Sequence, residues 1–168
     1  MGKRVLVEAA QTPIGKRGGV MSGFHATELL ALSQRGVVER AGIDPKEVGQ
    51  VVASCVTKAG EQSFNIGRNA WLSAGLPYEV AGTTIDCQCG SSQQANHFIS
   101  NLIHTDAIDV GIACGVEAMS RIPLGSESMN GPVIPRTESF PWDMPDQFTA
   151  AERIAEKRGL NRDDVDGQ

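Results

Sequence analysis

Cys89 is the residue whose type and setting best suit it to covalent chemistry. It lies between a strand-like segment, residues 83–86, and a predicted helix, residues 93–104. At such a junction the thiol faces unpaired backbone N–H groups and the positive end of the helix dipole, which both favour the thiolate. The small residues 90–92 leave room for a carbonyl group, and backbone N–H groups can stabilise an oxyanion there. The pattern therefore indicates a nucleophile that attacks a carbonyl carbon.

Two other interpretations of Cys89 stay open on the residues alone. A free cysteine is often a buried structural residue. The pair formed by Cys87 and Cys89 can also serve a redox or metal site, but no Cys or His group supplies two further ligands at the usual spacing. We therefore expect no metal.

The remaining cysteines and the histidines are expected to be structural. Cys55 and Cys114 lie within strand patterns and are predicted to be core residues, and Cys87 is predicted to pack beneath Cys89. A histidine near a helix end is more often a partner of the helix dipole than a base. His25 and His104 lie at the ends of predicted helices, and His97 lies off the apolar face of residues 93–104, so none of the three is expected to act in catalysis.

Alternating strands and helices must position these residues. Strand-like segments are separated by amphipathic segments of helical period, an order typical of βαβ units. The predicted fold class is α/β, with a mainly parallel mixed sheet and helices on both faces. Strands are predicted over residues 4–10, 48–56, 83–86 and 109–114, and helices over 24–41, 65–74 and 93–104.

The character of the chain changes after residue 118. Residues 121–145 contain five prolines and little periodicity, and a helix is predicted over 146–158, with Asn161 able to cap another. We expect residues 1–118 to form one α/β layer that carries the nucleophile. Residues 119–168 are expected to be the truncated beginning of a second domain.

Composition excludes several classes of protein. The 168 residues carry a net charge of -5 with scattered basic residues, which argues against nucleic-acid binding. No apolar run approaches the ~20 residues that span a bilayer. Four cysteines are too few for a disulfide scaffold. We expect a soluble, cytoplasmic protein without membrane association.

Five ordered segments together resemble the thiolase family. Residues 84–95 are similar to the thiolase nucleophile motif, with Cys89 on its cysteine, and residues 115–120, Gly-Val-Glu-Ala-Met-Ser, resemble the signature that ends the half-domain. Ser92 is a departure, because many members have glycine there. The other matching segments are residues 8–16, 60–68 and 149–166.

The resemblance implies an acyltransferase that works through a Cys89 acyl-thioester. It would cleave a 3-ketoacyl-CoA with coenzyme A or run the reverse condensation, with acyl-CoA as substrate and no tightly bound cofactor. Residues 1–118 would be the family's amino-terminal half-domain, and residues 119–168 would begin its loop domain, which covers substrate and CoA. Glu117 would brace the site. The match is closest to thiolases of bulky or sterol-derived CoA esters, which implies a role in fatty acid or steroid β-oxidation.

The resemblance also implies parts that cannot be mapped onto these residues. A histidine base and a second cysteine belong to the carboxy-terminal half of the family, so we expect this chain alone to be inactive. The full-length protein is expected to be a homodimer or tetramer. The alternative is a non-catalytic half-domain that functions only by assembly with another chain.

Overall fold

The computed structural model describes residues 4–129, 131 and 136–167. The chain divides into two compact units, Met1–Gly131 and Pro132–Gln168, and each is described by itself. By contacts, residues 119–131 therefore belong with the first unit, whereas the sequence places a domain boundary after residue 118. The boundary after residue 118 is predicted between two domains of the protein, and it stays a prediction.

The first unit is built on a three-stranded parallel sheet. Its strands are β1 (Val48–Ser54), β2 (Ala81–Ile85) and β3 (Val110–Gly115), in the order β2-β1-β3. The last residue of β1, Ser54, pairs with Ile85 on one side and Gly115 on the other, so all three strands end at one edge. Ligands of open parallel sheets bind at this carboxyl edge.

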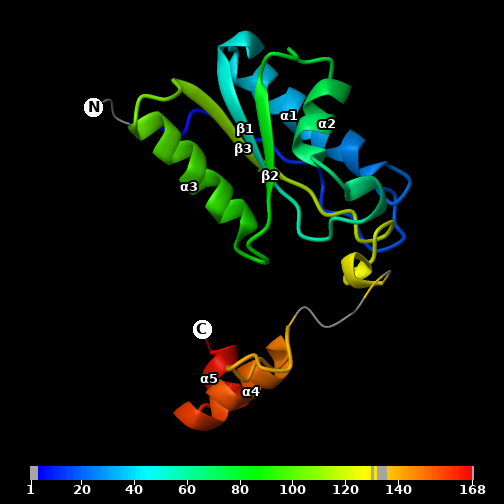
Figure 1. Ribbon diagram of the computed structural model, residues 1–168, viewed down its shortest axis with the longest axis vertical. Helices are drawn as coiled ribbons and strands as arrows, with labels where there is room; N and C mark the ends of the chain where they lie inside the picture. The colour runs from blue at the N-terminus through cyan, green and yellow to red at the C-terminus, as the bar shows by residue number, and fades with distance from the viewer. Residues whose placement is uncertain (1–3, 130, 132–135, 168) are drawn as a thin grey trace. The chain divides into compact units, whose positions relative to one another are not determined.

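Helices cover both faces of the sheet (Figure 1). On one face α1 (Ala26–Ala41) and α2 (Ile66–Ser73) pack together, and α3 (Ser91–His104) covers the other. Gly67 lets α2 approach closely, because a Cβ there would lie 2.5 Å from the Cβ of Ala53. The α/β class predicted from the sequence is confirmed, with a sheet that is parallel throughout the described residues. Short 3-10 turns lie at Pro45–Glu47, Gly60–Gln62 and Ser126–Ser128.

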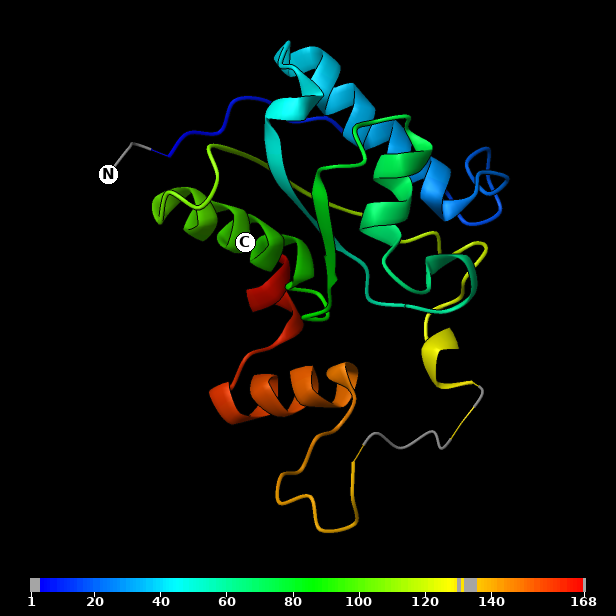
Figure 2. The same ribbon diagram turned by 45° about the horizontal axis from the view of Figure 1, so that its top comes forward.

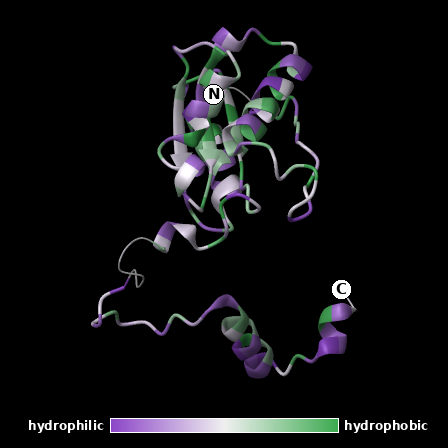
Figure 3. Cartoon of the chain, turned by 90° about the vertical axis from the view of Figure 1, so that its right-hand side faces the viewer, coloured by the Kyte–Doolittle hydropathy of each residue, from purple (hydrophilic) through white to green (hydrophobic). Residues whose placement is uncertain are grey.

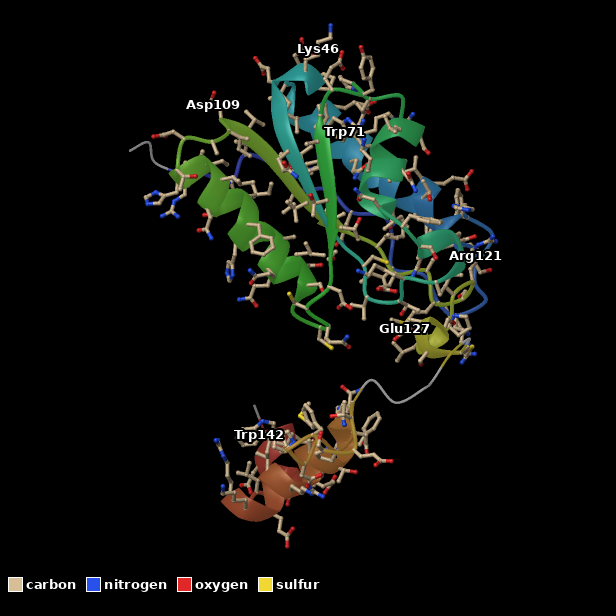
Figure 4. All side chains as sticks on the ribbon, viewed as in Figure 1. Lys46, Trp71, Asp109, Arg121, Glu127 and Trp142 are labelled. Atoms are coloured by element: carbon tan, nitrogen blue, oxygen red, sulfur yellow. The ribbon has the colours of Figure 1, made fainter. Side chains whose placement is uncertain are left out.

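Apolar burial explains why these elements hold together. Ala95 and Ile99 of α3 pack on Val52 of β1. On the opposite face Trp71 is fully buried among valines and donates a hydrogen bond from its Nε1 to the carbonyl of Pro77 (Figure 4). Because both faces are covered, β1 is buried along most of its length, as its β-branched run predicts.

The strand predicted over residues 4–10 is wrong. These residues form an extended segment outside any sheet, with Val5, Leu6 and Val7 exposed. Side chains tether the segment instead: Glu8 accepts a hydrogen bond from Arg40, and Arg4 donates one to Ser100. A strand-like pattern shows that side chains suit a pleated, half-buried surface. It does not show that a neighbouring strand is available for pairing.

The second unit contains α4 (Gln147–Arg158) and α5 (Arg162–Asp166). Asn161 caps α5, as the sequence predicts, and Asp146, predicted as the first residue of a helix, is the N-cap of α4. Both helices are mainly hydrophilic in Figure 3, with short hydrophobic patches. Among the described residues, no helix has both the length and the apolar character that crossing a membrane requires.

Candidate active site

A tight turn joins the carboxyl end of β2 to α3 (Figure 2), and Cys89 lies in this turn. Gln88, directly before it, has a left-handed backbone with φ of 51°. A non-glycine residue rarely adopts this conformation, and such residues gather at functional sites. Two backbone bonds close the turn, from the N–H of Gly90 to the carbonyl of Cys87 and from Ser91 to Gln88. Cys89 is consequently exposed at the start of α3.

Ser91, not Cys87, fills the space beneath the turn. Its buried hydroxyl donates to the carbonyl of Gln88 at 2.6 Å and accepts from the N–H of Cys87 at 2.8 Å. The prediction that Cys87 packs beneath Cys89 is therefore wrong, since Cys87 is exposed. The left-handed residue between the two cysteines reverses the chain, and the hydroxyl satisfies the backbone groups underneath.

The first turn of α3 begins at Ser91, two residues after Cys89. No side chain in the described part of the molecule caps this helix, whose N-cap is Gly90. The opening N–H groups of a helix have no partner within the helix and carry its positive dipole end. The local setting that the sequence predicts for Cys89, a thiol at a helix start, is thus present.

A cavity of about 410 Å³ opens beside Cys89. Small-molecule pockets span about 300–1,000 Å³. The cavity lies at the carboxyl edge of the sheet, opposite to the end marked by Lys46 and Asp109 in Figure 4. It is lined by the ends of β1 and β3, the turn and the start of α3; its polar side chains include Ser54, Thr57, Ser92 and Glu117.

Glu117 braces the far wall of this cavity. Its Oε1 accepts hydrogen bonds from the backbone N–H groups of Val56 and Thr57, and its Oε2 accepts one from Nε2 of Gln62 at 3.1 Å. Gln62 is fully buried and in turn accepts from the N–H of Ala118 at 2.7 Å. The carboxylate therefore joins the segment after β1 to the segment after β3, a role that only its motif suggests in the sequence.

Cys55 and Cys114 are in a different state from the exposed thiols. Burial, together with the charge of Glu117, raises the pKa of Cys55 to about 12. Burial likewise raises the pKa of Cys114 to about 11. Both therefore remain protonated at neutral pH, and Cys55 is buried among core residues although it also borders the cavity. The expectation that these two are structural thiols agrees with their surroundings.

None of the three histidines lines this cavity. His25 caps α1, where its Nδ1 accepts from the N–H of Thr27, and its Nε2 lies 3.5 Å from Glu61. His97 and His104 lie on α3, and the cavity lining includes neither of them. Across the described ranges, no group of three His, Cys, Asp or Glu residues could hold a metal ion.

Sequence reasoning missed Ser54, Gln62 and the role of Ser91. Each is a polar residue that is buried in the fold. The available signal is weak: Ser54 ends a β-branched run, and a serine there lies at the edge where parallel strands gather functional groups. Gln62 gives no sign in the sequence that it contacts residues 117 and 118.

Comparison with known proteins agrees with this architecture. The family described as "Thiolase, N-terminal domain" matches residues 4–167. Steroid 3-ketoacyl-CoA thiolase FadA6 of Mycobacterium tuberculosis is 42% identical over 176 residues, which cover 99% of this chain and 43% of that protein. Beta-ketoadipyl-CoA thiolase of Escherichia coli is 34% identical over 182 residues, covering 99% of this chain and 45% of the relative.

A solved structure supports the same relationship. The acetyl-CoA acetyltransferase of Bacillus anthracis superimposes with a TM-score of 0.65 at 36% sequence identity, over 71% of this chain and 30% of that one. The chain thus spans less than half the length of these relatives. The chain belongs to the thiolase family, whose amino-terminal domain its residues 4–167 match.

Proposed function

We propose that the complete protein carrying this sequence is a thiolase-type acyltransferase and that Cys89 is its nucleophile. The observation that carries the proposal is the exposed thiol of Cys89, at the start of α3 and beside the cavity, in a chain of this family. A helix start favours a thiolate, and the adjacent backbone N–H groups are suited to an oxyanion.

The proposed reaction has two acyl-transfer steps. The sulfur of Cys89 attacks the 3-keto carbon of a 3-ketoacyl-CoA, and the bond between C2 and C3 breaks. The acyl group stays on Cys89 as a thioester, and the released C2 carbanion takes a proton to become acetyl-CoA. A second coenzyme A thiol then attacks the thioester, which forms the shortened acyl-CoA and restores the Cys89 thiol. The reverse sequence is the condensation.

We propose a bulky, sterol-derived acyl-CoA as the substrate class. The support is the 42% identity with a relative named as a steroid 3-ketoacyl-CoA thiolase, which extends over nearly the whole chain. Cytoplasmic location and assembly into a homodimer or tetramer remain parts of the same proposal, as does the absence of a tightly bound cofactor. The histidine base and second cysteine of the reaction would come from the carboxy-terminal half that the family resemblance implies.

A coenzyme A exchange assay tests this function. The complete protein is incubated with acetyl-CoA and isotopically labelled coenzyme A, and the label that enters acetyl-CoA is measured. We expect exchange in the wild type and in Cys87→Ser, and none in Cys89→Ser. Because the two cysteines share one turn, Cys87→Ser is a matched control. Full exchange in Cys89→Ser would refute the assignment of the nucleophile.

The second candidate is a non-catalytic half-domain that works by assembly. It is favoured by the exposed apolar side chains of the extended segment, where Leu6 is 83% exposed. An exposed apolar segment of this kind is suited to burial against another chain. Size-exclusion chromatography distinguishes the two: a monomer with thiolase turnover excludes assembly as the sole function.

A further inference from the structure

Two hydroxyl groups connect the sheet to the start of the helix that follows Cys89. The Oγ atoms of Ser54 and Ser92 lie 2.7 Å apart, although the residues are 38 positions apart in sequence. Ser54 is buried at the end of β1, and Ser92 is the second residue of α3. Both residues line the cavity beside Cys89. The hydrogen bond therefore lies in the lining of the cavity beside Cys89.

The hydrogen bond between Ser54 and Ser92 continues the apolar contact between β1 and α3 as far as the first turn of the helix. Side chains alternate along a strand, so Ser54 shares a face of β1 with Val52, which packs on Ala95. Ser92 precedes Ala95 by three residues and is its neighbour on the helix surface. The apolar side chains hold the body of α3 against β1, and the two hydroxyls hold its first turn.

Gly115 makes room for this arrangement. It pairs with Ser54 in the sheet, and a Cβ at its position would lie 2.0 Å from the Oγ of Ser54. Any side chain there would displace the Ser54 hydroxyl or the end of β3. The Ser54 hydroxyl thus lies at the meeting point of β1, β3 and α3.

We propose that Ser54 and Ser92 form a positioning pair for Cys89, an inference that rests on the proposed acyl transfer. Ser91 sets the shape of the turn through its bonds to Cys87 and Gln88. The pair sets where that turn lies relative to the sheet and the cavity. Neither serine forms or breaks a bond in the reaction. Both hold the Cys89 thiol and the N–H groups of the first turn of α3 in position for the substrate carbonyl.

Local hydrogen exchange in the complete protein tests this directly. The reporter amides are those of Gly90, Ser91 and Gln94, which are hydrogen-bonded in the turn and the first helical turn. We expect exchange roughly threefold to tenfold faster in Ser54→Ala and in Ser92→Ala, the range that loss of one net hydrogen bond produces. The double variant should add little beyond either single change, because both remove the same bond.

A matched control and a second perturbation keep the test decisive. Ser73→Ala removes an exposed serine at the end of α2 and should leave the reporter amides unchanged. Gly115→Ala keeps both serines in the sequence but should reproduce the faster exchange, because its Cβ clashes with the Ser54 hydroxyl and disturbs the bond to Ser92. The proposal is overturned if the reporter amides keep wild-type exchange in both serine variants, or if the α1 amide of Leu29 accelerates equally.

Turnover separates positioning from the proposed function itself. In the coenzyme A exchange assay, the serine variants should lose roughly threefold to tenfold in kcat with little change in KM for acetyl-CoA, since the pair acts on the nucleophile's position. An unchanged kcat in both variants would contradict the positioning role. Absent turnover in the wild type would refute the acyl-transfer proposal, whereas the exchange data would still decide whether the pair fixes the turn.

Discussion

Treatment of the 168-residue chain with iodoacetamide at pH 7 should modify its four cysteines at very different rates. Only the thiolate reacts, so the rate follows the ionised fraction and access to the sulfur. With a pKa of about 12 for Cys55 and about 11 for Cys114, the ionised fractions at pH 7 are about 10⁻⁵ and 10⁻⁴. Free cysteine in solution, with a pKa of about 8.5, is a few per cent ionised at this pH, on the order of 10⁻².

Cys55 and Cys114 should therefore react at least about a hundredfold more slowly than free cysteine. Cys87 and Cys89 are exposed and should be modified first, whereas the burial of Cys55 and the partial burial of Cys114 slow access further. The assay is a quenched time course followed by proteolysis and mass spectrometry of each cysteine peptide. Cys89→Ser and Cys87→Ser identify which thiol of the shared turn reacts faster, and we expect Cys89.

Modification of Cys55 or Cys114 at a rate similar to that of Cys89 would refute this reasoning. Such a result would mean that the buried thiols ionise or become accessible readily. A parallel unfolding measurement is the control, because global unfolding would expose all four cysteines together.

Three further predictions concern the supports of the site. The free energy of unfolding should fall as pH rises from about 9 to 11, because Cys55 and Cys114 stay protonated in the folded state and ionise in the unfolded one. The expected fall is about 1.4 kcal/mol per pH unit for each of these two thiols. Urea titrations of the wild type and Cys114→Ala test this, and the free energy of the variant should fall less steeply with pH. Glu117→Gln should destabilise the protein by about 1–3 kcal/mol, because an amide cannot accept all three hydrogen bonds; equal stability by denaturant titration would contradict the brace. Ser91→Ala should cost about 1–3 kcal/mol, since it leaves the N–H of Cys87 without its partner and removes one of the two hydrogen bonds to the carbonyl of Gln88, while Ser73→Ala should be neutral in the same titration.

The local pattern of the sequence predicted most of the elements. The periodicity of residues 93–104 finds α3, and the β-branched run at 48–56 finds β1, because burial on a helical or strand face leaves a direct mark on residue spacing. Gly42 ends α1 with a left-handed φ of 65°, as a glycine after a helical pattern predicts. These features depend on neighbours in sequence.

Features that depend on distant partners were not predictable in this way. Residues 4–10 have a strand pattern but no strand partner in the described fold. The exposure of Cys87 follows from the left-handed Gln88 and from the Ser91 hydroxyl, neither of which the cysteine spacing reveals. The same holds for the bond between Ser54 and Ser92, which requires the parallel register of β1 with its neighbours.

The site of the acyl group tests the central claim most directly. The complete protein is incubated with acetyl-CoA without free coenzyme A, quenched in acid and digested, and the peptide carrying the turn is sequenced by tandem mass spectrometry. The account predicts one acetyl group on the sulfur of Cys89, lost on treatment with hydroxylamine. An acetyl group on Cys87 or Cys55, or on no cysteine of this chain while turnover proceeds, would contradict it.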